Sequence, residues 1–187
     1  ANWNTPQTVA VTGVDDSLDD GNVTFSVVTA ASSSSDPSFD NINPSDVSAT
    51  NTDNDTSGFT VSTISGNTTE AGGAATFTVV LTAQPTANVT VDLSSSDTTE
   101  GTVGASSLTF TSANWSTPQT VTVTGVNDEV DDGDVVFGVV TAAATSGDAN
   151  YDGLNPANVS VTNADNDTAG ITIGAASGPT TEAGGTA

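Results

Sequence analysis

The sequence predicts an all-β protein built as a tandem array of β-sandwich domains. The first observation is a strict internal repeat: residues 11–14 (Val-Thr-Gly-Val) return as residues 123–126, and residues 53–56 (Asp-Asn-Asp-Thr) return as residues 165–168, always 112 positions later. The second is the alternation of apolar residues with threonine between clusters of Gly, Pro, Asn and Asp, which is typical of half-buried strands separated by turns. A period this long indicates whole domains in tandem rather than a solenoid of small units.

One full period, residues 57–168, is expected to contain seven strands. Residues 75–82 place apolar side chains at the odd positions and mostly threonine at the even ones, which predicts a strand with one buried face. In chain order, strands A to G are expected near residues 59–64, 75–82, 89–93, 108–110, 121–123, 137–139 and 159–161. Seven antiparallel strands in about 110 residues have the size and spacing of an immunoglobulin-like β-sandwich.

The repeat divides the chain into three parts. Residues 1–56 correspond to the C-terminal part of a module, residues 57–168 form one complete module, and residues 169–187 correspond to the N-terminal part of a following module. The two partial modules lack strands, so we expect that neither folds alone and that neighbouring repeats or subunits of the same protein complete them. The two ends together still lack a counterpart of residues 76–112.

The composition excludes several classes of function. The 187 residues include no Lys, Arg, His, Cys or Met but 23 Asp and Glu, giving a formal charge of −23. Without these residues the chain has no Schiff-base lysine, no histidine- or cysteine-based triad and no zinc ligands of the usual kind. Without cations it is not expected to bind nucleic acid, and no apolar run is long enough to insert into a membrane. The remaining oxygen donors suit hard cations, calcium above all.

The acids are expected to gather at one end of the complete module. Successive strands of such a sandwich run in opposite senses, so loops A–B, C–D and E–F share a pole with the exit from strand G. These four segments carry ten of the thirteen acids of the period, namely Glu70, Asp97, Glu100, Asp128, Glu129, Asp131, Asp132, Asp134, Asp165 and Asp167. Convergence from four segments favours a calcium site over the alternative, in which solvated loop acids only keep the surface soluble.

The motifs of this pole resemble those of the Calx-β domain, a calcium-binding sandwich found in sodium–calcium exchangers, an integrin and large bacterial surface proteins. The resemblance rests on residues 69–73 (Thr-Glu-Ala-Gly-Gly), 96–102 (Ser-Asp-Thr-Thr-Glu-Gly-Thr), 126–134 (Val-Asn-Asp-Glu-Val-Asp-Asp-Gly-Asp) and 165–167 (Asp-Asn-Asp). It implies an immunoglobulin-like fold and Ca²⁺ as the bound ion.

The resemblance also implies a set of metal ligands. In the complete module they are Glu70, Asp97, Asp128, the backbone carbonyl of Val130, Asp132, Asp165 and Asp167. The counterparts in the partial modules are Asp15, Asp16, Asp20, Asp53, Asp55 and Glu182. Asn127 stands where an acid is usual, whereas the first copy keeps Asp15 at that position.

These observations predict a structural and adhesive repeat segment of a large extracellular or cell-surface protein, in which calcium stiffens the joints between modules. The alternative is an adhesin module that recognises a glycan or a partner protein through an exposed aromatic or polar patch. Trp115 and its copy Trp3 are expected to cap the core rather than to bind sugar. Catalysis is not expected, because the acids lie in a solvent-facing cluster without an evident substrate cleft.

Overall fold

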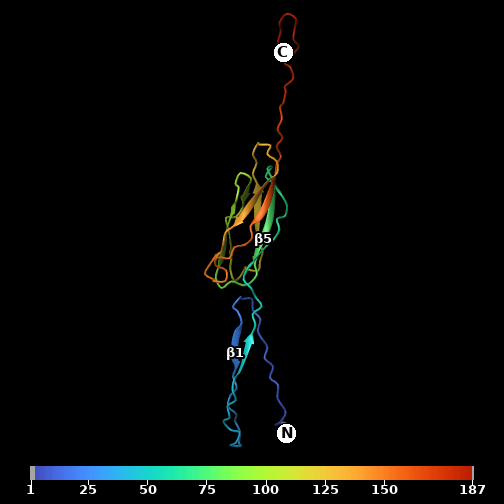
Figure 1. The fold of residues 1–187 in the computed structure, drawn as a ribbon. Coiled ribbons are helices and arrows are strands. Elements are labelled where there is room, and N and C mark those ends of the chain that lie inside the picture. Colours follow the sequence, from blue (N-terminus) through green and yellow to red (C-terminus); the bar gives the residue numbers. More distant parts are fainter. Residues whose placement is uncertain (1–2, 187) are drawn as a thin grey trace.

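The computed structural model describes residues 3–186, and every regular element in this range is a β-strand. The chain is elongated, with its N- and C-terminal ends at opposite ends of the long axis (Figure 1). Ten of the twelve strands, β3 to β12, lie in the complete module, whereas β1 (Val23–Val27) and β2 (Val47–Asn51) form a separate antiparallel pair in residues 3–56.

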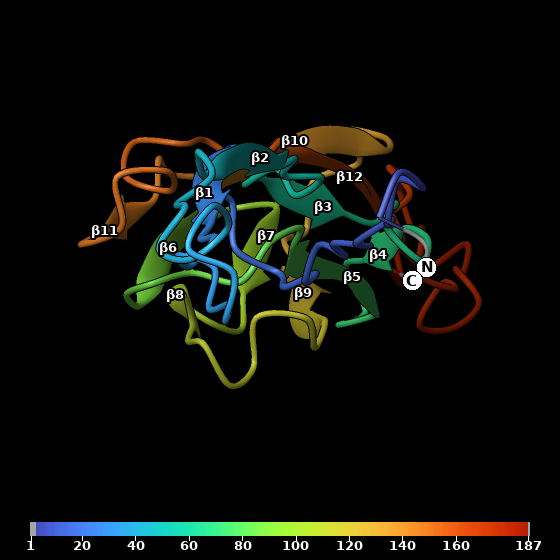
Figure 2. The ribbon, with the colours of Figure 1, turned by 90° about the horizontal axis from the view of Figure 1, so that it is seen from below.

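The complete module is a sandwich of two sheets. One sheet has the strand order β3-β5-β9-β7, and the other has the order β11-β6-β10-β12-β4, with β8 also paired to β6. Figure 2 shows the strands of both sheets end-on. The bounds are β3 Phe59–Val61, β4 Thr68–Thr69, β5 Ala74–Leu81, β6 Val89–Ser95, β7 Gly101–Val103, β8 Ser107–Phe110, β9 Gln119–Gly125, β10 Val135–Thr141, β11 Thr145–Ser146 and β12 Val159–Ala164.

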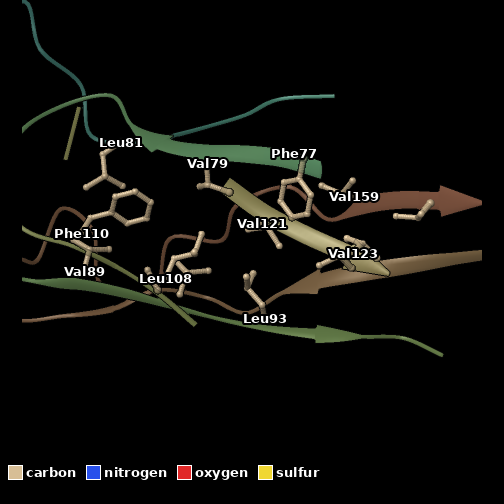
Figure 3. Close-up of a cluster of buried hydrophobic side chains, with 14 of the residues drawn as sticks. Phe77, Val79, Leu81, Val89, Leu93, Leu108, Phe110, Val121, Val123 and Val159 are labelled. Carbon is tan, nitrogen blue, oxygen red and sulfur yellow. The ribbon is translucent and has the colours of Figure 1, made fainter. Parts of the chain in front are cut away.

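The core is formed by the alternating apolar residues that predicted the strands. Phe77 of β5 lies beside Val121 of β9 in the same sheet. With Val79 and Val123, these side chains are buried against the other sheet, which includes Leu93 (Figure 3). Burial of one face and exposure of the other follows from the two-residue period of a strand. The all-β immunoglobulin-like sandwich is therefore confirmed.

Three short strands were not predicted. They are β4, β7 and β11, and the first two arise because the chain changes sheets. Residues 101–103, assigned to a loop from the sequence, pair with β9, and after the turn at residues 104–106 the chain continues as β8 on β6 of the other sheet. A run of only three residues gives no alternation long enough to identify a strand.

The strand directions agree with the prediction. β6 and β12 are both antiparallel to β10 and therefore end at the same end of the module. The hydrogen bond from the Asn163 side chain to the Val126 carbonyl places the end of β9 there too. β4 is parallel to β12, with Thr68 opposite Asn163, so it ends there too. Four chain segments therefore enter one pole from adjacent strand ends, which positions their acids.

Residues 3–56 contain counterparts of β10 and β12, namely β1 and β2, but no counterpart of β9 or β11 and no covering sheet. Phe25 is 37% exposed, whereas its copy Phe137 is 4% exposed. Val9 and Val11 are exposed, whereas their copies in β9 are fully buried. Residues 3–56 have no counterparts of strands β3 to β8, and these apolar side chains are exposed.

Trp115 and Tyr151 close the end of the module opposite the acids. Trp115 packs against the core, as predicted, and its carbonyl accepts a hydrogen bond from the Leu81 amide (3.1 Å). Tyr151 is fully buried and packs edge-on against Phe59. Its hydroxyl donates to the Ala83 carbonyl (2.6 Å) and accepts from the Ala83 amide (3.1 Å), which fixes the turn after β5.

We expect Tyr151→Phe to lower the free energy of unfolding by about 1–3 kcal/mol, because it leaves two buried backbone groups of Ala83 without a partner. Urea unfolding followed by circular dichroism measures the change. The control is Val136→Ala at a position 64% exposed, where the change should stay within about 0.5 kcal/mol. An effect of Tyr151→Phe no larger than that of the control would contradict the assigned role of the hydroxyl.

Candidate metal centre

The parallel pairing of β4 with β12 creates the first group of acids. Both strands end at the same pole, so Glu70, directly after β4, lies beside Asp165 and Asp167, which follow β12. Each of these three residues offers a carboxylate oxygen within 4.8 Å of the others. Glu70 is almost fully buried, and one of its oxygens accepts a hydrogen bond from the Asn166 amide (3.1 Å).

A second group lies at the same pole. Glu100 directly precedes β7, and Asp128 and Asp132 belong to the loop between β9 and β10, residues 127–134, here called the acidic loop. Their carboxylate oxygens also lie within 4.8 Å of one another. The two groups together define the acidic pole of the module.

Asn163 connects the two groups through a buried polar network. Its side-chain amide donates to the Glu100 carboxylate (3.4 Å) and to the Val126 carbonyl (3.1 Å). Its side-chain oxygen accepts a hydrogen bond from the hydroxyl of Thr68 (3.0 Å), two residues before Glu70. Because Asn163 and Thr68 are almost fully buried, these bonds fix the strand ends from which both groups of acids emerge.

Backbone amides give the acidic loop its shape. Asp128 accepts a hydrogen bond from the Val130 amide (2.7 Å), and Asp165 accepts one from the Gly133 amide (2.8 Å). Gly133 has a φ of 77°, a conformation that favours glycine. Asp131 instead contacts the segment that follows the module. It accepts a hydrogen bond from the amide of Ala169, at the start of the next module (2.7 Å).

The pKa values of the first group show in which carboxylates crowding disfavours the ionised form. The Asn166 amide lowers the pKa of Glu70, but desolvation and the nearby carboxylates outweigh it and raise that pKa above its ordinary value. Desolvation and then repulsion from Asp165 and other acids raise the pKa of Asp167. Hydrogen bonds from the amides of Asp167 and Gly133 lower the pKa of Asp165, which is therefore the most readily ionised of the three.

The donors at this pole fit a hard divalent cation. Among the polar side-chain atoms buried in the described residues, Oδ2 of Asp167 is the one without a hydrogen-bond partner. An unpartnered oxygen among other carboxylates is suited to coordinate an ion, and an all-oxygen ligand set suits calcium. In such a centre Glu70, Asp165 and Asp167 would bind on one side, and Glu100, Asp128 and Asp132 on the other.

The first copy reproduces this geometry in part. A pocket in residues 13–55 is lined by Asp15, Asp16, Asp20, Asp53 and Asp55, five of the six acids expected in the partial modules. The bond from the Gly133 amide to Asp165 has its counterpart in the bond from Gly21 to Asp53 (2.7 Å). Desolvation and repulsion from Asp53 raise the pKa of Asp55, as at Asp167. The sixth acid, Glu182, is exposed and lies outside both groups.

Two expected ligands of the complete module, Asp97 and the Val130 carbonyl, belong to neither group of carboxylates. Asp97 lies outside both groups: its carboxylate accepts hydrogen bonds from the Thr99 hydroxyl and amide, which lower its pKa. The Val130 carbonyl accepts a hydrogen bond from the Asp132 amide (2.9 Å), which leaves one lone pair free.

Glu100 lies in the second group of carboxylates, whereas Asp97 lies outside both groups. Glu100 was assigned to this end of the module but not chosen as a ligand. A signal was present, because residues 98–100 repeat the Thr-Thr-Glu sequence of residues 68–70. In both places the glutamate is almost fully buried, directly at the end or the start of a short strand.

In metal-free solution, we expect the free energy of unfolding to fall as the pH rises from about 4 toward neutrality. The native pKa values of Glu70 and Asp167 are raised, so the folded state binds more protons than the unfolded state in this window. Their contribution is lost as the pH rises through the raised values. Asp165, with a lowered pKa, has the opposite effect below about pH 4. Thermal melting against pH measures the balance.

The variant Asp167→Asn identifies the source of this pH dependence. It should flatten the fall toward neutral pH, because it removes a carboxylate whose ionisation opposes folding. A metal-free protein whose stability continues to rise up to neutral pH would contradict the electrostatic account.

Comparisons with known proteins agree with the fold. The family described as the Calx-beta domain matches the chain twice, at residues 2–55 and 50–167. No match was found among the curated proteins searched. The two matches cover most of the chain, and the second spans all the strands of the sandwich described above. The chain therefore belongs to the Calx-beta domain family, a non-catalytic family of β-sandwich modules, and contains it as a tandem repeat.

Proposed function

We propose that this chain is a structural repeat segment of an extracellular or cell-surface array or filament, in which calcium at the acidic pole stiffens the joint between successive modules. The observation that carries the proposal is the position of the two carboxylate groups, which converge at the end of the module where the chain passes into the next one. Calx-beta domains are known to bind calcium, which supports the choice of ion.

Repulsion explains why an ion would stiffen the joint. Six carboxylates from four chain segments crowd one end of a module that contains no Lys, Arg or His. Without a cation their mutual repulsion pushes the four segments apart, whereas a bound divalent cation makes the same closeness favourable. The acidic loop would then hold a single shape.

The acidic loop also holds the first residues of the next module. Asp131 accepts the hydrogen bond from Ala169, and in the first copy Asp19 accepts the equivalent bond from the Ser57 amide (2.8 Å). Only seven residues, 52–58, separate β2 from β3 of the complete module, and they include Asp53 and Asp55. A change in the shape of the loop therefore acts directly on the direction in which the chain continues.

The exposed apolar side chains of residues 3–56 support neighbouring repeats as the partners. Val9, Val11 and Phe25 are exposed, yet their copies are buried by strands β3 to β8 of the complete module. The complete module of this chain therefore already contains one copy of the surface that would cover these side chains. Strands equivalent to residues 57–112, from an adjacent repeat or a subunit of the same protein, would bury them.

An extracellular location agrees with the chemistry. Calcium is abundant outside cells, where modules with weak, millimolar affinity are used. The absence of Lys and Arg removes the cleavage sites of trypsin-like proteases. Within residues 3–186 we found no helix with the length and hydropathy that a bilayer-spanning segment needs.

The second candidate function is adhesion through a glycan-binding or protein-binding surface. A glycan-binding module would present an exposed aromatic side chain, but Trp115 packs against the core of the complete module. The exposed copy, Trp3, lies in residues whose covering strands are missing. Binding of a glycan or partner protein therefore remains the second candidate, which a glycan array with a complete module would test.

Calcium is expected to raise the melting temperature in a saturable way, by the equivalent of about 2.7 kcal/mol at a free concentration about 100 times the dissociation constant. The double variant Asp128→Asn, Asp132→Asn should lose most of this stabilisation. Asp92→Asn is the matched control, because Asp92 is exposed on β6 away from both groups. Equal stabilisation of the double variant and the parent would refute the site.

Asp167→Asn separates repulsion from ion binding. It should stabilise the protein without calcium at neutral pH, because it removes a carboxylate with a raised pKa. It should also reduce the stabilisation by calcium, because it removes a ligand. Calorimetric melting with and without calcium measures both changes, and a loss of stability in metal-free solution would contradict the proposed balance.

When a chelator removes calcium, the distribution of interatomic distances in the chain should become broader and its maximum dimension less sharply defined. Small-angle X-ray scattering measures this, because a flexible joint broadens the distance distribution of an elongated particle. Identical distributions with and without the chelator would show that the joint does not depend on the ion.

A further inference from the structure

The first acidic loop, residues 15–22, contacts the complete module that follows it. The Gln84 amide donates a hydrogen bond to the Ser17 carbonyl (2.7 Å), and the Asn150 side-chain amide donates one to the Asp19 carbonyl (2.6 Å). Figure 1 shows the contact where the blue segment reaches the lower end of the complete module. A shallow cleft between the two parts is lined by residues of both, including Asp19 and Asn150.

The second acidic loop provides an internal comparison, because it has the same fold without this contact. Ser17, Leu18 and Asp19 are half-buried, whereas their copies Glu129, Val130 and Asp131 are exposed. Val130 is 57% exposed. The middle of the loop is therefore covered where a complete module follows it.

The surface that receives the loop is held in shape by its own contacts. We call it the basal surface, formed by Gln84, Thr86, Asp148 and Asn150. Asp148 is almost fully buried and accepts hydrogen bonds from the Thr86 amide (2.8 Å) and the Asn150 amide (3.0 Å). These bonds join the turn after β5 to the loop before β12. The positions of Gln84 and Asn150 are therefore set by contacts within the complete module and not by the acidic loop.

The contacts at the basal surface are made with the backbone of the loop. The Gln84 amide and the Asn150 side chain both donate to carbonyl groups, which every residue provides. Neither donor bonds to the side chain of Ser17 or Leu18. The copies differ at these two positions, where Glu129 and Val130 replace serine and leucine. The acids that form the metal groups flank this part of the loop, at Asp16 and Asp20 and at their copies Asp128 and Asp132.

We propose that the basal surface is a docking site for the backbone of the acidic loop of the preceding repeat, with Asn150 as its main side-chain donor. Because the docking reads carbonyl groups, it tolerates the side-chain differences between copies. Modules of this kind can therefore follow one another in any order with the same joint. This inference concerns the joint contact itself and does not require an ion.

Hydrogen exchange of the Gln84 amide, measured by NMR on the full chain in calcium buffer, tests the proposal. Protection of this amide reports docking, since its acceptor is in the loop, and the Leu93 amide, bonded to the Ser106 carbonyl inside the module, reports folding. The variants Asn150→Ala and Asn150→Asp should each reduce the protection of Gln84 by roughly two- to tenfold, the range expected for one hydrogen bond. Protection of Leu93 should not change.

The matched control exchanges the loop side chains for those of the other copy. In the double variant Ser17→Glu, Leu18→Val, Gln84 should stay protected to within about twofold, because the carbonyl acceptors remain. A loss of protection in this control would show that docking reads side chains. Equal protection of Gln84 in the parent and in both Asn150 variants would show that Asn150 does not hold the joint. Either result overturns the proposal.

Discussion

Repulsion among carboxylates that the fold brings to one end of a module is the constraint on which the rest of this structure depends. The parallel pairing of β4 with β12 places Glu70 beside Asp165 and Asp167, and Asn163 ties this group to Glu100. The raised pKa values of Glu70 and Asp167 record the cost of this arrangement. A fold that maintains such crowding without a single basic side chain gains most from a divalent cation.

The two ends of a module have complementary properties. The acidic pole is strained by like charges, whereas the opposite end is fixed by neutral and paired groups, with Tyr151 bonded to Ala83 and Asp148 bonded to two amides. The acidic loop of one module meets this rigid end of the next. In the proposed function, stiffness at the joint would therefore depend mainly on the shape of the acidic loop, which its charges influence.

The sequence predicted the sandwich, the strand directions and the convergence of the acids, because the two-residue alternation and the repeat carry that information directly. It did not predict β7 or the change of sheets at residues 104–106, since three residues are too few to show a period. It named Asp97 but not Glu100 as a ligand, whereas Glu100 and not Asp97 belongs to a group of carboxylates that could hold an ion. A loop carboxylate can cap its own turn, as Asp97 does with Thr99, and only the three-dimensional structure separates this role from ion binding.

Anomalous X-ray diffraction from crystals grown with calcium tests the central claim most directly. The account predicts anomalous density at the acidic pole, with oxygens of Glu70, Asp165 and Asp167 around one position and those of Glu100, Asp128 and Asp132 around the other. Their distances to the ion should be about 2.3–2.6 Å. Crystals soaked in excess calcium that show no density at this pole, with the same carboxylates turned apart into solvent, would contradict it.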